Sequence, residues 1–509
     1  MMKKQITIIT LLSIISCTTI FGQNKYDYNW LFGIAAPQQN YTANLIDFNR
    51  YGFDHIDSII LGSGAGTGSN NAEISDKYGN LLFYSNGCRI MDSTHHIMEG
   101  GDSISYGDAW ERFCHDEYGD GYPTLRNTIA LPSPGDENGY FLLHKRGEWD
   151  YNSDYLYMPE LYYSYVDMTQ NEGKGKVIEK NRIIFSTTNL VQGYLTACKH
   201  TNGKDWWVIQ MEKDTNIYFK VLIKEDTIEV DSQSIGPRFT LLSNPGQAVF
   251  SPDGSKYVLY NPANECLIYD FDRETGELSN LHQVEVQDSG AFYGVAISSN
   301  SRFLYLSARN DLFQVDLFAD NYQSSLIHIA HRDGFRDPYF PSTFSFSQLA
   351  PDCKIYIVSG TTNNHIHVIN KPNEKGEACD FRQHSINLPI RNNNFSIPNF
   401  PHFRTDEDQI CDSTITWIPD EYIIKKINKL SVYPNPASDE ATISVYSDGY
   451  EQGKISIYTI TGELVKTLNI DSEATKSLDV RSMKPGVYAV EYDSYVNVGR
   501  EVKKLVVVK

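Results

Sequence analysis

Residues 246–280 constrain the fold more than any other stretch of the chain. Their sequence, GQAVFSPDGSKYVLYNPANECLIYDFDRETGELSN, alternates β-branched and aromatic runs with turns rich in Pro, Asp, Asn and Gly, which predicts short antiparallel strands. The turn and the strand after it recur, with Ser-Pro-Asp-Gly at 251–254, Ser-Ser-Asn at 298–300 and Ala-Pro-Asp at 350–352. Four-stranded units with a period of about 40–50 residues are typical of a β-propeller, so we expect an all-β fold.

Weaker copies of this turn extend the repeat and predict one β-propeller domain over residues 24–404. Six units are recognisable, three of them from turns at 76–80, 136–139 and 201–205. Strand-like runs in residues 24–61 and a final strand at 395–404 are expected to complete one more unit and close the ring, which removes exposed sheet edges. We expect about seven four-stranded blades, with six or eight left open.

The N-terminus predicts export. Lys3 and Lys4 precede an apolar run from residue 6 to residue 15, which is typical of a signal peptide over residues 1–22 and too short to span a bilayer. Ile-Ile-Ser-Cys at 14–17 leaves open a lipoprotein in which Cys17 carries the lipid. No other segment could cross a membrane, so we expect no transmembrane segment and a secreted or outer-surface location.

Charge and cysteine content exclude further classes of protein. The net charge of −20 argues against nucleic acid as a partner, because phosphate binding needs a basic surface. The expected mature chain keeps seven cysteines, an odd number that leaves at least one unpaired. Disulfides are permitted after export, and two of Cys353, Cys379 and Cys411 could pair. No Cys-x-x-Cys occurs, so no zinc site is expected.

The composition and the residue pattern of the chain change after residue 404. Residues 405–428 are polar and irregular and are interpreted as a linker. Residues 429–509 contain short alternating strands separated by Gly and Pro turns, which predicts a small β-sandwich.

Three motifs in this last module carry a resemblance to a known family. They are VYPNPA at 432–437, IYTITG at 457–462 and MKPGVY at 483–488, ahead of a terminal KLVVVK. Together they closely resemble the type A C-terminal sorting domain of the Bacteroidetes type IX secretion system. The resemblance implies export by the type IX machinery, removal of this domain, and attachment to surface lipopolysaccharide or release. The motif residues of interest are Tyr433, Pro434, Asn435, Pro436, Gly462, Pro485, Gly486 and Tyr488.

The propeller region also resembles exported Bacteroidetes propeller proteins that carry such sorting modules. The resemblance rests on WLFG at 30–33, ISDKYGNLLFYSNG at 74–87, HIMEGG at 96–101 and IPNF at 397–400. It implies a fold and a location, and it implies no activity.

An aromatic insertion after the second unit is the favoured candidate for ligand binding. Trp149, Tyr151, Tyr155 and Tyr157 lie among Glu148, Asp150 and Asp154, and aromatic residues with a polar tip suit partly wet contact surfaces. They could form a platform that stacks on sugar rings or holds a protein. The plainer interpretation is an elongated strand pair that covers the blade below.

Other chemistry is less well supported, and no catalytic residue or resident cofactor is expected. His365 and His367 alternate on one strand and could share a metal, although packed or solvated histidines explain them more simply. Cys-His-Asp-Glu at 114–117 lacks an oriented base and nucleophile. Asp270 and Asp272, and the DEYGD run at 116–120, leave calcium open without matching a full calcium-loop pattern.

The sequence therefore predicts an exported propeller that acts as a binding or interaction module for a glycan or a protein. The competing hypothesis is a hydrolase or lyase acting on polysaccharide, lactone or peptide, with residues drawn from loops around the central channel. A third is a passive component of a surface layer. Fold alone does not decide between them.

Overall fold

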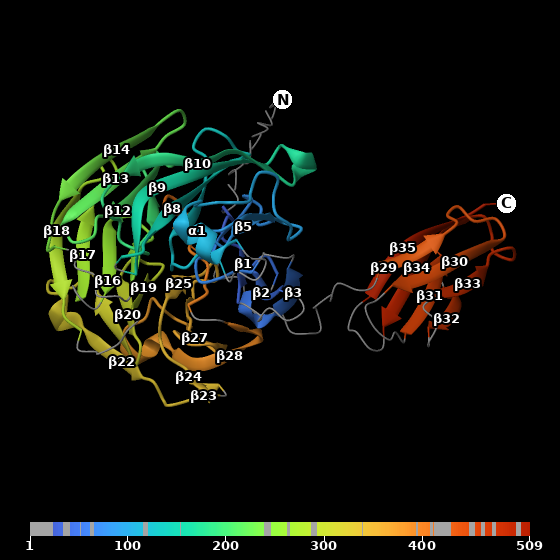
Figure 1. Ribbon diagram of the computed structural model, residues 1–509. Helices are drawn as coiled ribbons and strands as arrows, with labels where there is room; N and C mark the ends of the chain where they lie inside the picture. Colours follow the sequence, from blue (N-terminus) through green and yellow to red (C-terminus); the bar gives the residue numbers. More distant parts are fainter. Residues whose placement is uncertain are drawn as a thin grey trace, which may run out of the picture. The chain divides into compact units, whose positions relative to one another are not determined.

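The computed structural model forms two compact units, Met1–Thr416 and Trp417–Lys509 (Figure 1). The structure describes the following residues: 24–33, 41–50, 52–61, 66–115, 121–152, 154–238, 246–261, 265–286, 293–337, 339–392, 395–407, 411, 429–446, 453–459, 464–470, 475–494 and 500–508. The predicted signal peptide and residues 412–428 of the predicted linker lie outside them. No helix within these ranges has the length and apolar character needed to span a membrane.

The described part of the first unit contains seven antiparallel sheets of three or four strands, each made of consecutive strands. The first two are β1 (Asn29–Phe32), β2 (Tyr41–Asp47), β3 (Ile56–Leu61), then β4 (Ala72–Ser75), β5 (Leu81–Ser85), β6 (Ile90–Asp92). The next two are β7 (Thr128–Pro132), β8 (Gly139–Asp150), β9 (Tyr155–Asp167), β10 (Lys176–Ser186), then β11 (Thr196–Lys199), β12 (Trp206–Met211), β13 (Ile217–Ile223), β14 (Ile228–Ser234).

The remaining three sheets follow in the same way. They are β15 (Gln247–Phe250), β16 (Lys256–Asn261), β17 (Glu265–Phe271), β18 (Leu278–Val284), then β19 (Tyr293–Ile297), β20 (Phe303–Ala308), β21 (Asp311–Asp316), β22 (Ile327–His331), and last β25 (Ser347–Leu349), β26 (Ile355–Ile357), β27 (Asn363–Ile369), β28 (Phe381–Asn392). A two-stranded hairpin, β23 (Arg336–Asp337) and β24 (Phe340–Pro341), precedes the last sheet. Helix α1 (Asp108–Phe113) and the 3₁₀ turns Gly52–Asp54, Asn171–Gly173, Gln323–Ser325 and Gly376–Cys379 complete the elements.

The order of the sheets in space follows their order in the chain. β1 packs on β4, β4 on β7, β10 on β14, β11 on β15, β15 on β19 and β19 on β25, and β28 returns to β2 and β3. At this return the Asn44 amide accepts from the Ile390 N–H and donates to the Ile390 carbonyl, both at 2.9 Å. Many short antiparallel strands in small sheets were expected, and this coarse prediction is confirmed.

Residues 395–404 do not form the final strand that the sequence predicted. The described residues there have no strand assignment, and β1 to β3 form a three-stranded sheet of their own. The segment instead touches the first strands of several sheets. Asn399 donates to the carbonyls of Thr128 and Leu195 at 2.8 and 2.9 Å, and its N–H donates to the Asn71 carbonyl at 3.2 Å. It therefore lies beside the starts of β4, β7 and β11.

Aromatic packing and an ion pair fix this inner segment to the start of the unit. The Phe400 ring lies 6.1 Å from that of Trp30, and the Phe403 ring lies 5.4 Å from that of Tyr26. Arg404 makes a bidentate pair with Asp27, at 2.5 and 2.8 Å, and both side chains are buried. The two ends of the unit thus meet inside the protein.

Two disulfides are present among the described cysteines. Cys353 bonds to Cys411, so two of the three late cysteines pair as the sequence suggested. Cys88 bonds to Cys114. The other cysteines, which carry no disulfide, are buried: Cys198, Cys266 and Cys379.

The second unit consists of two antiparallel sheets. One has the order β29 (Lys429–Tyr433), β30 (Glu440–Tyr446), β33 (Thr475–Asp479), and the other β32 (Leu464–Ile470), β31 (Gly453–Thr459), β34 (Gly486–Ser494), β35 (Arg500–Val507). Ile443 from the first sheet and Ile455, Val490 and Leu505 from the second belong to one buried cluster. The two sheets therefore share a single core.

Substitution Arg404→Met should destabilise the first unit strongly, because it leaves the Asp27 carboxylate buried without its cation. We expect the free energy of unfolding to fall by about 3–5 kcal/mol, measured by urea denaturation. Lys77→Met, which breaks an exposed pair with Glu137, is the control and should cost less than about 1 kcal/mol. Equal losses in the two variants would contradict the role given to the buried pair.

Candidate functional site

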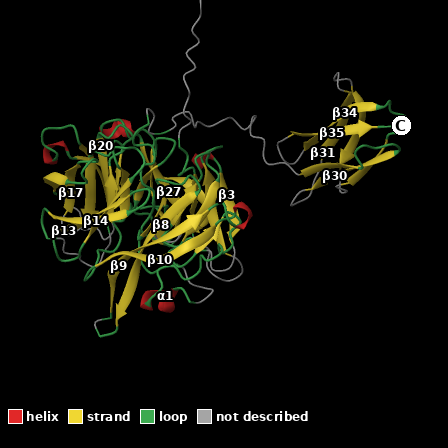
Figure 2. Ribbon diagram, turned by 90° about the horizontal axis from the view of Figure 1, so that it is seen from above, coloured by secondary structure: helices red, strands yellow, loops and turns green. Residues whose placement is uncertain are grey.

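The predicted aromatic insertion is the tip of a long hairpin formed by β8 and β9. These strands are 12 and 13 residues long, longer than the usual five or six residues or so, and their paired ends project from the body of the unit next to α1 (Figure 2). Side chains on these projecting ends are more exposed than side chains on a strand pair that ends within the body of the unit.

A β-bulge at Gly147 determines which side chains of β8 lie on each face of the hairpin. The register shifts between Arg146 and Glu148. The Gly147 N–H donates to the Tyr122 hydroxyl oxygen at 2.6 Å, and that hydroxyl donates to the Ser105 carbonyl at 3.3 Å. A Cβ at Gly147 would lie 3.0 Å from the Tyr122 oxygen and 3.1 Å from another side chain, so a larger residue would require these neighbours to shift.

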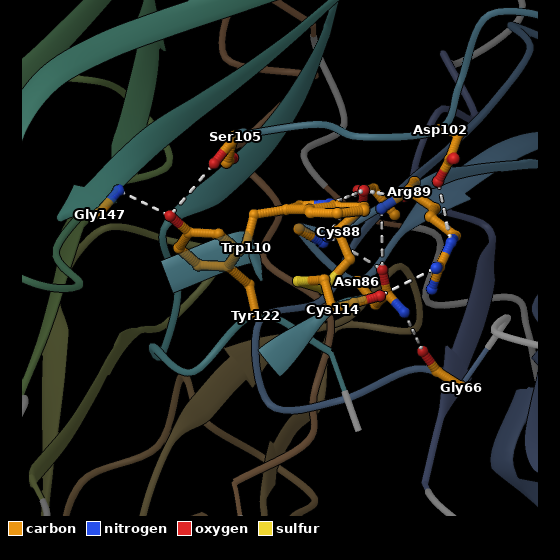
Figure 3. Close-up of a disulfide and its surroundings, with 12 residues drawn as sticks. Gly66, Asn86, Cys88, Arg89, Asp102, Ser105, Trp110, Cys114, Tyr122 and Gly147 are labelled. Carbon is orange, nitrogen blue, oxygen red and sulfur yellow. Dashed lines mark hydrogen bonds and ion pairs between the residues drawn. A yellow bond between two sulfur atoms is a disulfide. The ribbon is translucent and has the colours of Figure 1, made fainter. Parts of the chain in front are cut away.

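The Cys88–Cys114 disulfide supports the base of this hairpin (Figure 3). It joins the end of α1 to the loop after β5. Arg89 adds a second link, since it donates to the Cys114 carbonyl at 2.9 Å and to Asp102 at 3.0 Å. The Trp110 indole donates to the Cys88 carbonyl at 3.2 Å. Because α1 packs on β8, these links limit the movement of the hairpin.

Trp149 lies on the face of the hairpin that packs against α1. Directly opposed residues of an antiparallel pair share a face, and Trp149 opposes the buried Leu156. The Arg112 guanidinium lies 4.2 Å from the centre of the Trp149 ring, and the Phe113 ring lies 6.0 Å away. The Trp149 indole N–H donates to Asp154 at 3.1 Å. Trp149 therefore anchors the hairpin tip.

Tyr155 and Tyr157 lie together on the opposite face. They oppose Asp150 and Glu148 in the register and are two residues apart on one strand, so their side chains point the same way. Lys213 donates to the Tyr155 hydroxyl oxygen at 2.6 Å, and its ammonium lies 4.2 Å from the centre of the same ring. Tyr151 is in the turn and is 72% exposed. The structure brings the three tyrosines together, and Trp149 lines the same concave surface.

A concave surface of about 510 Å³ lies at this tip. Its lining includes the three tyrosines and Trp149, and it also has amide, carboxylate and hydroxyl groups from Asp150, Asn152, Thr188 and Asn189. The sequence analysis missed Thr188, Asn189 and Lys213, which lie 31 or more residues further along the chain than Tyr157. Nothing local in the sequence places them beside the hairpin.

The histidines and acidic residues considered for metal binding are engaged elsewhere. His365 pairs with Asp337 at 2.7 Å. His367 is buried, and it accepts from the His384 N–H at 2.9 Å and contacts the Thr343 carbonyl at 3.3 Å. In the ranges that the structure covers, no group of three or more His, Cys, Asp or Glu side chains is placed to hold a metal ion.

The other sequence candidates have structural partners or lie outside the described residues. Asp270 accepts from Asn280 at 2.8 Å and pairs with Lys256, and Asp272 accepts from the Glu274 N–H at 2.8 Å within its turn. Cys114 is in a disulfide, so its sulfur is not a nucleophile. Residues 116–120 are outside the described part.

The proline-rich motif of the second unit docks on its last strand. Asn435 donates to the Lys504 carbonyl at 2.6 Å and accepts from the Val506 N–H at 2.8 Å. Tyr433 and the flanking Pro434 and Pro436 are exposed. Pro434 and Pro436 have no backbone N–H to donate to a neighbouring strand. The Asn435 side chain instead makes hydrogen bonds to the backbone of the last strand.

The third sequence motif of this unit, MKPGVY at 483–488, closes a turn. Tyr488 is buried and donates to the Lys484 carbonyl at 2.8 Å, across the turn that holds Pro485 and leads into β34 at Gly486. Gly462 lies outside the described residues.

Comparison with known families decides what this module is. Residues 431–508 match the family described as the secretion system C-terminal sorting domain. The second unit is a secretion system sorting domain. The protein is therefore handled by the type IX secretion system and exported to the cell surface or released, as the sequence resemblance implied.

Comparisons over the whole chain are much weaker. No curated protein matches the sequence. Among solved structures, the chain is similar to PorZ, a surface component of the type-IX secretion system of Porphyromonas gingivalis, with 14% identity and a TM-score of 0.33 over 96% of this chain and 59% of that one. The chain thus spans 59% of the length of PorZ.

Two further solved structures are similar over 73% of this chain. One is a functionally unknown protein from Desulfotomaculum acetoxidans, with 14% identity, a TM-score of 0.40, and coverage of 73% of this chain and 99% of that one. The other is a putative 6-phosphogluconolactonase from Bacteroides uniformis, with 10% identity, a TM-score of 0.37, and coverage of 73% and 98%. At these scores we draw neither fold nor function from the three structures.

Buried His367 should make stability fall at acid pH. Burial lowers the pKa of His367 to about 3, whereas the unfolded chain takes up the proton near pH 6.5. Between these values the unfolded state binds more protons, so the stabilising contribution is present above pH 6.5 or so and is lost as pH falls toward 3. In the His367→Gln variant the free energy of unfolding should depend less on pH, by up to about 1.4 kcal/mol per pH unit. Urea denaturation from pH 7 to pH 4 measures this dependence.

His328→Gln changes an exposed histidine and is the control for this experiment. It should keep the slope of the parent protein. A His367→Gln variant with the unchanged slope would show that His367 takes up its proton normally in the folded state.

Proposed function

We propose that this protein is an exported carbohydrate-binding β-propeller. Residues 1–22 are the signal peptide, 24–404 a seven-bladed propeller, 405–428 a linker, and 429–509 a β-sandwich that serves as the type A sorting domain. The cyclic order of the seven described sheets supports the blade number, and the shared core of two sheets supports the sandwich. The propeller is the cargo that the sorting domain delivers to the cell surface.

The observation that carries the proposal is the concave surface at the tip of the β8–β9 hairpin. Tyr151, Tyr155 and Tyr157 offer ring faces for the apolar C–H faces of a sugar, and their hydroxyls can bond in a wet site. Asn152 and Thr188 are amide and hydroxyl groups of the kind that fix the orientation of a polar ligand. The supported base of the hairpin lowers the entropy cost of ordering these side chains on binding.

The alternative function is a hydrolase or lyase acting on polysaccharide, lactone or peptide. That hypothesis drew its catalytic groups from loops around a central channel. Residues 395–404 occupy the middle of the ring, which favours a ligand site away from the axis. Incubation of the mature protein with a set of glycans, followed by analysis of the products, separates the two hypotheses. Turnover of a glycan would support the enzyme.

A glycan array probed with the purified mature protein tests the binding proposal. We expect binding to a defined group of glycans, and repetition in the presence of a chelator tests whether calcium takes part. A blank array would overturn the glycan proposal and direct attention to a protein ligand.

Substitutions at the hairpin tip should weaken binding of any glycan found on the array. We expect Tyr155→Ala and Tyr157→Ala each to lower affinity about five- to thirtyfold, equivalent to about 1–2 kcal/mol, measured by isothermal titration calorimetry. Tyr339→Ala, which removes an exposed tyrosine from the β23–β24 hairpin, is the matched control. Unchanged affinity in both tip variants would remove the hairpin from the binding site.

A further inference from the structure

A buried arginine in the middle of the ring has no carboxylate partner. Arg126 is 3% exposed and precedes β7. Its Nη2 donates to the Asn399 side-chain oxygen at 2.6 Å, and its guanidinium lies 5.5 Å from the centre of the Phe346 ring. Its Nη1 is buried without a hydrogen-bond partner. Within the described residues, Arg126 takes part in no ion pair.

An isolated charge in such a place is costly. Desolvation of an ion costs several kcal/mol after relaxation unless a counter-charge and hydrogen bonds offset it. Burial lowers the pKa of Arg126 to about 9, so the guanidinium still carries its charge at neutral pH. The buried Arg404, by comparison, has the Asp27 carboxylate. Arg126 therefore needs a negative charge that no described side chain provides.

The loop around Arg126 presents further unused donor groups. The Thr124 hydroxyl and the Asn127 side-chain amide nitrogen are also buried without partners. A hydroxyl and an amide N–H can both donate, so the unsatisfied groups are of the kind that surrounds an anion.

The loop is held in position by its other hydrogen bonds. The Asn127 N–H donates to the Asn70 side-chain oxygen at 2.8 Å, and the Asn127 side-chain oxygen accepts from the Gly193 N–H at 2.7 Å. The donors are therefore fixed before any ion arrives, and binding costs little further ordering of the protein.

We propose that a small singly charged anion, a halide or a simple carboxylate, binds at Arg126 between the loop before β7 and the segment 395–404. The anion accepts from Arg126 Nη1 and neutralises the guanidinium. Since the same guanidinium bonds to Asn399, the ion stabilises the passage of the inner segment through the ring. This site is independent of the proposed glycan surface on the hairpin.

Thermal unfolding of the mature protein in different sodium salts at one ionic strength tests this site. Constant ionic strength holds general screening fixed. Replacing the bulky anion gluconate by chloride up to about 0.2 M should raise the unfolding midpoint by about 2–5 °C, in a saturable way. A larger rise with formate than with chloride would identify a carboxylate as the better occupant, and the reverse order a halide.

The variant Arg126→Met should remove the dependence on the anion. The matched control is Arg302→Met, which changes a more exposed arginine paired with Asp316 and should keep the full rise. Identical midpoints of the parent protein in gluconate, chloride and formate would overturn the proposal.

A direct observation covers the case in which Arg126→Met does not fold. Crystals of the parent protein grown in sodium bromide should give an anomalous peak within hydrogen-bonding distance of Arg126 Nη1. Density for water alone at that place, without anomalous signal, would show that the buried donors are hydrated and that no anion binds.

Discussion

The bidentate pair between Arg404 and Asp27 is the contact on which the first unit depends, because it joins the two ends of a series of consecutive sheets inside the protein. Repeats that contact only their neighbours have stabilities that add nearly independently along the chain. Here the residues before Arg404 pass through the middle and bond to strands from several sheets, while Asn44 links the first sheet to the last. Loosening one sheet would therefore disturb contacts made by others.

The hairpin formed by β8 and β9 shows how such a body can carry a binding surface. Loops positioned by a rigid scaffold are common places for function, and side chains locked by neighbouring contacts make more exact sites. The Cys88–Cys114 disulfide and α1 hold one face of the hairpin through Trp149. The other face is left for Tyr155 and Tyr157. Trp149 thus contributes both to the support of the hairpin and to the lining of the proposed binding surface.

Prediction from the sequence was accurate where the signal was local and failed where distant contacts decide. The aromatic insertion was singled out from its composition, but the packing of Trp149 against Arg112 and Phe113 was not predicted, because contacts between distant segments are not visible in one strand. The segment 395–404 was predicted to form a final strand. Its two prolines, Pro398 and Pro401, lack the N–H that a ladder needs, and this was the available sign that it would not pair.

The sequence by itself determined the short strands, their turns and the sorting domain, since each depends on residues within a few positions of one another. Only the tertiary structure decided the contents of the sites. Lys213 and Thr188 reach the hairpin from the chain after β10, and Asn399 reaches Arg126 from 273 residues away. The physical reason is that burial and electrostatic pairing depend on distance in space, and the packing of the sheets on one another sets those distances.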